Sequence, residues 1–82
     1  MPTSHDAQLR QRVRQRMDSG RLSPAAPRET LAGPGCSCPC AVCDEIIPSY
    51  ELEYEAETEA AGAQHFHFAC YVAWFIERRG GL

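Results

Sequence analysis

The sequence predicts a small α+β domain in which a cysteine turn, a β-hairpin and a C-terminal helix follow an arginine-rich helix and a linker. Three observations favour this class. Cys40 and Cys43 have the C-x2-C spacing of a tight turn, residues 50–57 alternate between apolar and acidic side chains, and residues 69–79 have a helical pattern before two glycines. A chain of 82 residues supports one domain. Chains this short often supplement their core with a metal ion or disulfides.

Residues 1–22 are expected to hold the arginine-rich amphipathic helix, with a frayed start. Leu9, Val13 and Met17 recur at i, i+4 and i+8, so they form one narrow apolar stripe on a helix spanning about 6–19. The arginines that flank this stripe are Arg10, Arg12, Arg14 and Arg16. Three apolar side chains cannot form a core, so this helix must dock on another element or form only in part.

The rest of the chain divides where its composition changes. Residues 23–39 are rich in proline and glycine, which predicts an extended linker. Residues 40–79 are expected to form a ββα module, and 80–82 a tail. Within this module, the alternation over 50–57 predicts a half-buried strand whose glutamates face solvent, and 64–68 predicts the returning strand.

Charge is distributed unevenly between the two halves of the chain. Residues 1–35 carry six arginines against three acids, whereas residues 36–82 carry two arginines against eight acids. The halves can attract each other, or each can face a different partner. We find no apolar run long enough for a membrane span and no apolar stretch typical of a secretory signal, so we expect a reducing, cytoplasmic location. In that setting clustered cysteines favour metal binding over disulfides.

Four residues have the spacing of a structural zinc site. The turn at Cys40 and Cys43 can aim two sulfurs at one point, and His67-x2-Cys70 supplies an imidazole and a third sulfur where the second strand meets the helix. The hairpin between the pairs brings them together. Three thiolates and one imidazole would surround one Zn2+ with no open position, which predicts a structural metal and no catalysis. The plainer alternative is that these cysteines are inert core residues.

The other two cysteines and a second histidine have no clear assignment from sequence. Cys36 and Cys38 lie too close for an easy disulfide, and their one-residue gap is poor for binding one zinc ion, so both are interpreted as spare. A redox-labile pair is the alternative. His65 is the weaker rival of His67 as the zinc ligand, because the HxxC loop of His67 is tighter.

Two resemblances rest on these motifs. The stretch "CAVCDEIIPSYELEYEAE…FHFACYVAW" resembles one zinc site of a LIM-type or treble-clef finger, which implies Cys40, Cys43, His67 and Cys70 as the ligands. It departs from LIM domains because a second site of their kind is missing, and from the usual turn because Asp44 stands where glycine is common. The chain from about residue 9 to 79 is also similar to a group of small uncharacterised proteobacterial proteins, which implies a bacterial cytoplasmic protein.

The sequence therefore predicts a non-enzymatic zinc-binding module that works through a protein partner, with no membrane and no small-molecule substrate. The alternative is a nucleic-acid-binding zinc protein whose Arg10–Arg16 helix contacts phosphates. A third hypothesis is a thiol redox sensor that uses Cys36 and Cys38.

Overall fold

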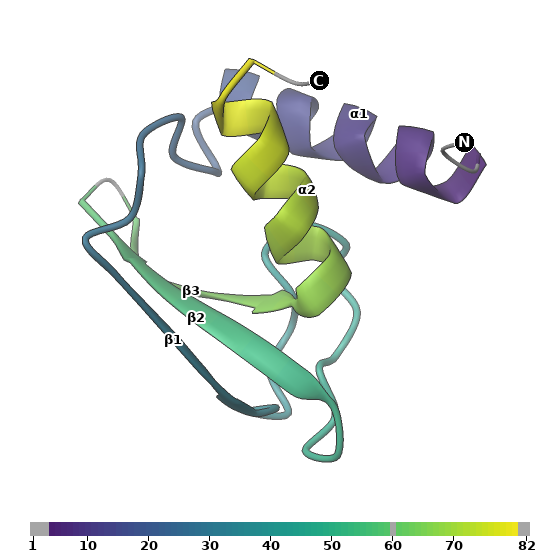
Figure 1. The fold of residues 1–82 in the computed structure, drawn as a ribbon, viewed down its shortest axis with the longest axis vertical. Helices are drawn as coiled ribbons and strands as arrows, with labels where there is room; N and C mark the ends of the chain where they lie inside the picture. Colours follow the sequence, from purple (N-terminus) through teal and green to yellow (C-terminus); the bar gives the residue numbers. More distant parts are fainter. Residues whose placement is uncertain (1–3, 60, 81–82) are drawn as a thin grey trace.

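The fold of the computed structural model is α+β, as predicted, and the structure describes residues 4–59 and 61–80. Its elements are α1 (Ser4–Asp18), β1 (Glu29–Pro34), β2 (Leu52–Thr58), β3 (Gly62–His67) and α2 (Phe68–Arg78). The strands form one antiparallel sheet in the order β1-β2-β3, and α2 runs from the end of β3 towards α1 (Figure 1). The expected frayed start covers residues 1–5; residues 1–3 lie outside the described residues, whereas residues 4 and 5 already belong to α1, so the helix begins earlier than predicted. Of the expected tail at 80–82, residues 81–82 also lie outside the described residues.

The arginine-rich helix docks on the rest of the chain through its predicted stripe. Val13 is fully buried, and Leu9 and Met17 pack against the same core cluster. The helix crosses α2 near the C-terminal half of that element (Figure 1). Gly20 follows the helix with a φ of 84°, the left-handed conformation that commonly ends helices. A short apolar stripe is therefore enough to dock this helix when a neighbouring helix covers the stripe.

The expectation of a linker over 23–39 is wrong for its central part. Residues 29–34 form β1, an edge strand that pairs with β2 from Glu29 opposite Glu57 to Pro34 opposite Leu52. Proline and glycine are tolerated on an edge strand because one side of its backbone faces no neighbour. The backbone groups on the open edge of β2 need hydrogen-bond partners. Pairing with β2 therefore outweighs the preference of the proline- and glycine-rich composition for an irregular linker.

The strand alternation is confirmed in β2, with three corrections. The strand begins at Leu52, not at residue 50 as predicted, and Tyr50 lies in a turn and is 86% exposed. Tyr54 and Ala56 face α2, where Tyr54 stacks on Tyr71 and Ala56 is fully buried. Leu52, expected on the covered face, is 48% exposed because it lies at the start of the strand. Glu53, expected in solvent, is only 6% exposed. One carboxylate of the predicted solvated ladder is therefore part of the interior.

The core lies between the sheet and the two helices. Trp74 of α2 is fully buried and stacks on Phe66 of β3, with ring centroids 4.9 Å apart. Its indole Nε1 donates a hydrogen bond to the Ser23 carbonyl oxygen at 2.8 Å, which ties the segment after α1 to α2. Within residues 4–59 and 61–80, no helix combines the length and apolar content needed to cross a bilayer.

Candidate metal centre

The first half of the centre is a tight turn at residues 40–45. The Cys40 backbone N–H donates to the Glu45 carbonyl at 2.9 Å, and the Asp44 N–H donates to the Cys40 carbonyl at 3.0 Å. Asp44 has a φ of 68°, the left-handed conformation for which glycine is favoured and which aspartate tolerates. The Val42 N–H also donates to the Cys40 sulfur at 3.4 Å, so the backbone stabilises negative charge on that atom.

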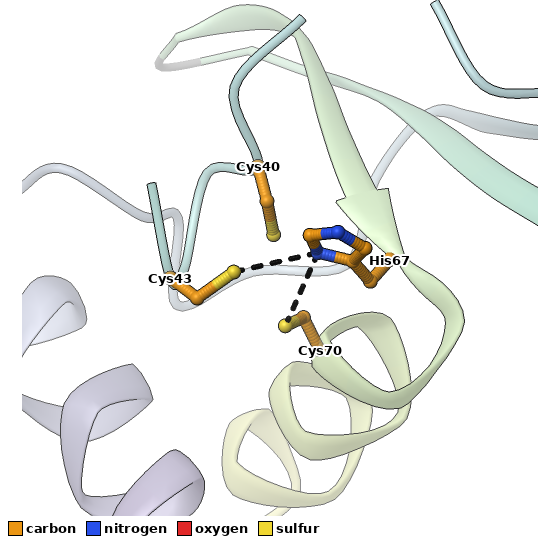
Figure 2. Close-up of side chains that lie close together, drawn as sticks. All are labelled: Cys40, Cys43, His67 and Cys70. Atoms are coloured by element: carbon orange, nitrogen blue, oxygen red, sulfur yellow. Dashed lines mark hydrogen bonds between the residues drawn. The ribbon is translucent and has the colours of Figure 1, made fainter. Parts of the chain in front are cut away.

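The second half comes from the junction of β3 and α2. His67 ends β3, and Cys70 lies in the first turn of α2, where the helix dipole favours a thiolate. Figure 2 shows the side chains of Cys40, Cys43, His67 and Cys70 converging from three segments. Their donor atoms all lie within 4.8 Å of one another. The four predicted ligands therefore meet in space, as their spacing indicated.

The distances match the edges of a metal-centred tetrahedron. Bond lengths for zinc place a sulfur and a nitrogen ligand about 3.6 Å apart. The His67 Nδ1 atom lies 3.4 Å from the Cys43 sulfur and 3.9 Å from the Cys70 sulfur. These two separations fit edges of such a tetrahedron, and the other pairs of donor atoms lie within 4.8 Å, so the four residues can hold a metal ion.

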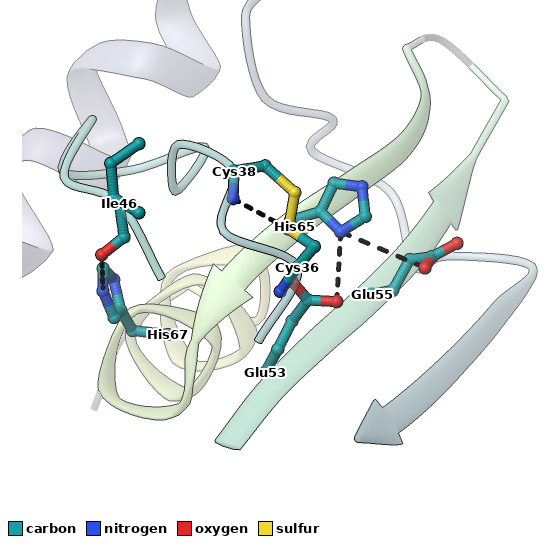
Figure 3. Close-up of a disulfide and its surroundings, with 7 residues drawn as sticks. All are labelled: Cys36, Cys38, Ile46, Glu53, Glu55, His65 and His67. Carbon is teal, nitrogen blue, oxygen red and sulfur yellow. Dashed lines mark hydrogen bonds and ion pairs between the residues drawn. A yellow bond between two sulfur atoms is a disulfide. The ribbon is translucent and has the colours of Figure 1, made fainter. Parts of the chain in front are cut away.

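The orientation of the His67 ring is fixed by the loop before β2. Its Nε2 atom lies 3.3 Å from the Ile46 carbonyl oxygen (Figure 3), whereas the Cys43 and Cys70 sulfurs lie near the other ring nitrogen, Nδ1. Donation from Nε2–H to this carbonyl places the proton there and leaves the Nδ1 lone pair for a metal ion. This is the support that metal-binding histidines in proteins usually have.

The electrostatics of the three thiols indicate that they cannot all ionise unaided. A hydrogen bond from the Cys70 thiol lowers the pKa of Cys40 to about 4. The same bond, together with burial, raises the pKa of Cys70. Burial also raises the pKa of Cys43. Without a cation one sulfur carries the charge, whereas a bound metal ion would stabilise three thiolates and release protons.

Arginines of α1 hold the turn in place. Arg12 donates to the Cys43 carbonyl at 3.2 Å. Arg16 donates to the Ala41 carbonyl at 3.2 Å and forms a two-pronged ion pair with Asp44, in which the shorter contact is 2.6 Å. This hydrogen bond lowers the pKa of Asp44. The predicted partner-contact arginines therefore have intramolecular roles that sequence spacing did not indicate.

The other two arginines of the helix bind a buried carboxylate of α2. Arg10 Nε lies 2.8 Å from one oxygen of Glu77, and Arg14 Nη1 lies 3.0 Å from the other. The Glu77 side chain is 3% exposed, so both of its oxygens are paired away from water. The attraction between the oppositely charged halves of the chain, one of the two possibilities that the charge distribution offered, is therefore found between these arginines and Glu77.

Cys36 and Cys38, which were interpreted as spare, form a second cluster with one residue of β2 and one of β3. Cys36 and Cys38 are joined as a disulfide, contrary to the expectation that their spacing is too tight for an easy one. Their sulfurs lie with Glu53 and His65 in a group of four donors within 4.8 Å (Figure 3). Sequence reasoning missed Glu53, because nothing in the alternating ladder distinguishes it from its neighbours.

An apolar groove lies beside the metal centre. It is lined by exposed side chains that include Ile46, Leu52 and Phe68, with exposures of 54%, 48% and 53%, and by the backbone around His67 and Cys70. Glu45 and Glu51 also line it. The residues of the metal centre thus belong both to the interior and to the wall of this groove.

No family identity follows from comparison. Searches against protein-family models, curated proteins and solved structures found no match. The likeness to LIM-type fingers and to the proteobacterial group stays a prediction, and the function is argued from the chemistry of the chain itself.

Proposed function

We propose that the chain is a non-enzymatic module in which Cys40, Cys43, His67 and Cys70 bind one structural Zn2+. The closed donor set is the observation that carries this proposal. Three thiolates and an imidazole are ligands that zinc prefers, and four protein donors leave no coordination position for water or substrate. The order of turn, hairpin and helix, with the helix supplying the last ligand, supports a treble-clef-like arrangement.

We further propose that the module acts by binding a protein partner through the groove formed by Ile46, Leu52 and Phe68. Exposed apolar side chains grouped in a hollow favour burial against another protein. The two glutamates that line the groove favour a partner segment that combines apolar residues with basic ones. This assignment is consistent with a bacterial, cytoplasmic adaptor or regulator.

The nucleic-acid alternative has less support. All four arginines between 10 and 16 make intramolecular contacts with Glu77 or with residues 41–44. Phosphate binding by these side chains would have to compete with those contacts. The module that they cover is also acidic, which opposes a polyanion.

The zinc assignment is tested by native mass spectrometry of the reduced chain reconstituted with zinc. Cys40→Ser should lose the ion of this centre and the compact charge-state distribution with it. Cys36→Ser should keep both. The opposite pattern, with zinc retained by Cys40→Ser and lost with Cys36→Ser, would overturn the ligand assignment.

The partner surface is tested with immobilised zinc-loaded chain. When cell lysate is passed over it, the wild-type chain should retain one defined protein, and Ile46→Ser should lose that protein. Leu31→Ser should still retain it, because the Leu31 side chain is equally exposed but lies on β1 outside the groove. Salt-sensitive binding of labelled DNA or RNA, measured by fluorescence anisotropy, would count against a protein partner. So would a partner that both variants retain.

A further inference from the structure

We propose that Cys36, Cys38, Glu53 and His65 form a second zinc site when the Cys36–Cys38 disulfide is reduced. The four donors are two sulfurs, a carboxylate oxygen and an imidazole nitrogen, and they lie within 4.8 Å of one another. They come from the loop before the turn and from β2 and β3 (Figure 3). None of them belongs to the centre described above, so this site is distinct from the proposed structural one.

The loop that carries both cysteines is held rigidly by backbone contacts. Ser37 donates its N–H to the Ile47 carbonyl at 3.0 Å, and Ile47 donates to the Cys38 carbonyl at 2.9 Å. Ser37 also has a φ of 60°, a conformation that non-glycine residues adopt at a cost. This turn leaves the Cα atoms of the two cysteines 5.2 Å apart. The sulfurs are therefore positioned by the backbone, and reduction need not disperse them.

Glu53 is an unusual ligand candidate because its carboxylate is buried without an arginine. Its side chain is 8% exposed, and the Cys36 N–H donates to its Oε1 atom at 3.0 Å. Among residues 4–59 and 61–80, no guanidinium pairs with it. A buried carboxylate is costly unless its charge is balanced. A cation next to Cys36 would provide this balance.

His65 points a nitrogen atom at the same place. Its Nδ1 atom lies 3.1 Å from Glu53 Oε2, yet this buried atom makes no hydrogen bond within the described part of the chain. A proton between the two would require better alignment. An unprotonated Nδ1 atom and a carboxylate oxygen at this separation have instead the arrangement expected of two ligands of one cation. The alternative is an ion pair between Glu53 and protonated His65.

The chemistry of the two states balances. A phosphine reductant gives two electrons to the sulfur–sulfur bond and takes up the oxygen of water, which leaves two thiols. Zinc then displaces both thiol protons and binds the two thiolates. The disulfide and the metal complex exclude each other, because each uses the same sulfurs. Cys36 is exposed, so this ion should exchange with chelators faster than the ion held by the buried Cys40 and Cys70.

The test is native mass spectrometry of the full chain, reduced with a phosphine and titrated with zinc alone. Wild type should bind two zinc ions, and each of His65→Asn, Glu53→Gln and the double variant Cys36→Ser/Cys38→Ser should bind one. Glu57→Gln removes an exposed carboxylate of the same strand and should keep two. Near-ultraviolet circular dichroism of the buried Trp74 verifies that each variant is folded.

The outcomes separate this proposal from the zinc centre proposed above. One ion in reduced wild type that persists in Cys36→Ser would overturn the second site and leave the first intact. Two ions in His65→Asn and in Glu53→Gln would also overturn it, since the donors would then be others. One ion in wild type that is lost in Cys36→Ser would contradict the ligand assignment of the first centre instead.

Discussion

At the scale of single residues, Gly35 decides how the loop at 36–38 lies against the segment at 46–48. A Cβ atom on Gly35 would collide with the Pro48 carbonyl oxygen and crowd that of Ile47. Because both groups are backbone, they cannot rotate away. This close approach sets the position of the loop that leads into the metal turn.

Gly35→Ala is therefore expected to lower the free energy of unfolding by about 1–3 kcal/mol, the usual cost of overpacking. Gly33→Ala is the matched control, because a Cβ atom there meets nothing within 4 Å. Its effect should stay below about 1 kcal/mol. Urea unfolding of the zinc-loaded chain, followed by Trp74 fluorescence, measures both. Equal effects of the two substitutions on the free energy of unfolding would contradict the view that the close backbone approach at Gly35 excludes a larger residue.

Glu77 shows how burial changes the value of an ion pair. Its side chain is 3% exposed and meets two guanidiniums, whereas Glu59 is 84% exposed and pairs, among the described residues, with Arg28 alone. Glu77→Gln should lower the free energy of unfolding by about 1–3 kcal/mol, less than a fully buried pair because Arg14 remains half exposed. Glu59→Gln should change it by less than about 0.5 kcal/mol. The same unfolding titration compares them, and a silent Glu77→Gln would contradict the view that this carboxylate anchors α1.

At the scale of elements, α1 contacts both the metal turn and α2 and stabilises their relative positions. Arg16→Gln removes the hydrogen bonds to the Ala41 carbonyl and to Asp44. We expect a lower melting temperature and faster transfer of zinc to a chelator, because the turn that carries two ligands loses a support. Arg21→Gln makes the same charge change at an arginine whose backbone is hydrogen-bonded but whose guanidinium has no hydrogen-bond partner among the described residues; its charge acts on Asp44 only through space.

A calorimetric scan and a zinc-release assay with a chromogenic chelator measure the two effects. The Asp44 contribution should be present above the ordinary pKa of a carboxyl group and should fade in acid, since Arg16 lowers the pKa of Asp44 in the folded chain. Equal release rates for Arg16→Gln and Arg21→Gln would show that the helix does not support the centre.

Sequence predicted some elements well and others poorly, for physical reasons. The stripe of α1, the alternation of β2 and the ligand spacing are local patterns, and all three are found in the structure. The strand β1 and the burial of Glu53 depend on which segments become neighbours, and local composition does not encode that. The disulfide between Cys36 and Cys38 and the contacts of Arg12 and Arg16 belong to the same class, because they need the folded geometry.

At the scale of the whole molecule, the centre at residues 40–70 joins segments whose buried residues form one small core cluster. The core contains few large buried side chains, and the largest of them are Trp74, Phe66 and Leu22. A chain of this size gains limited stability from such packing. A metal ion that links the turn, the end of β3 and the start of α2 would add the stability that this packing does not supply. Folding and zinc binding should therefore be coupled.

The most direct measurement is the two-dimensional 1H–15N NMR spectrum of the Cys36→Ser chain, recorded with zinc and after chelation. This variant leaves only the Cys40, Cys43, His67 and Cys70 centre. With zinc we predict dispersed amide signals throughout 40–79; after chelation these signals should collapse to the narrow range of an unfolded chain and return when zinc is restored. A dispersed, unchanged spectrum from chain shown by mass spectrometry to hold no metal would contradict the account.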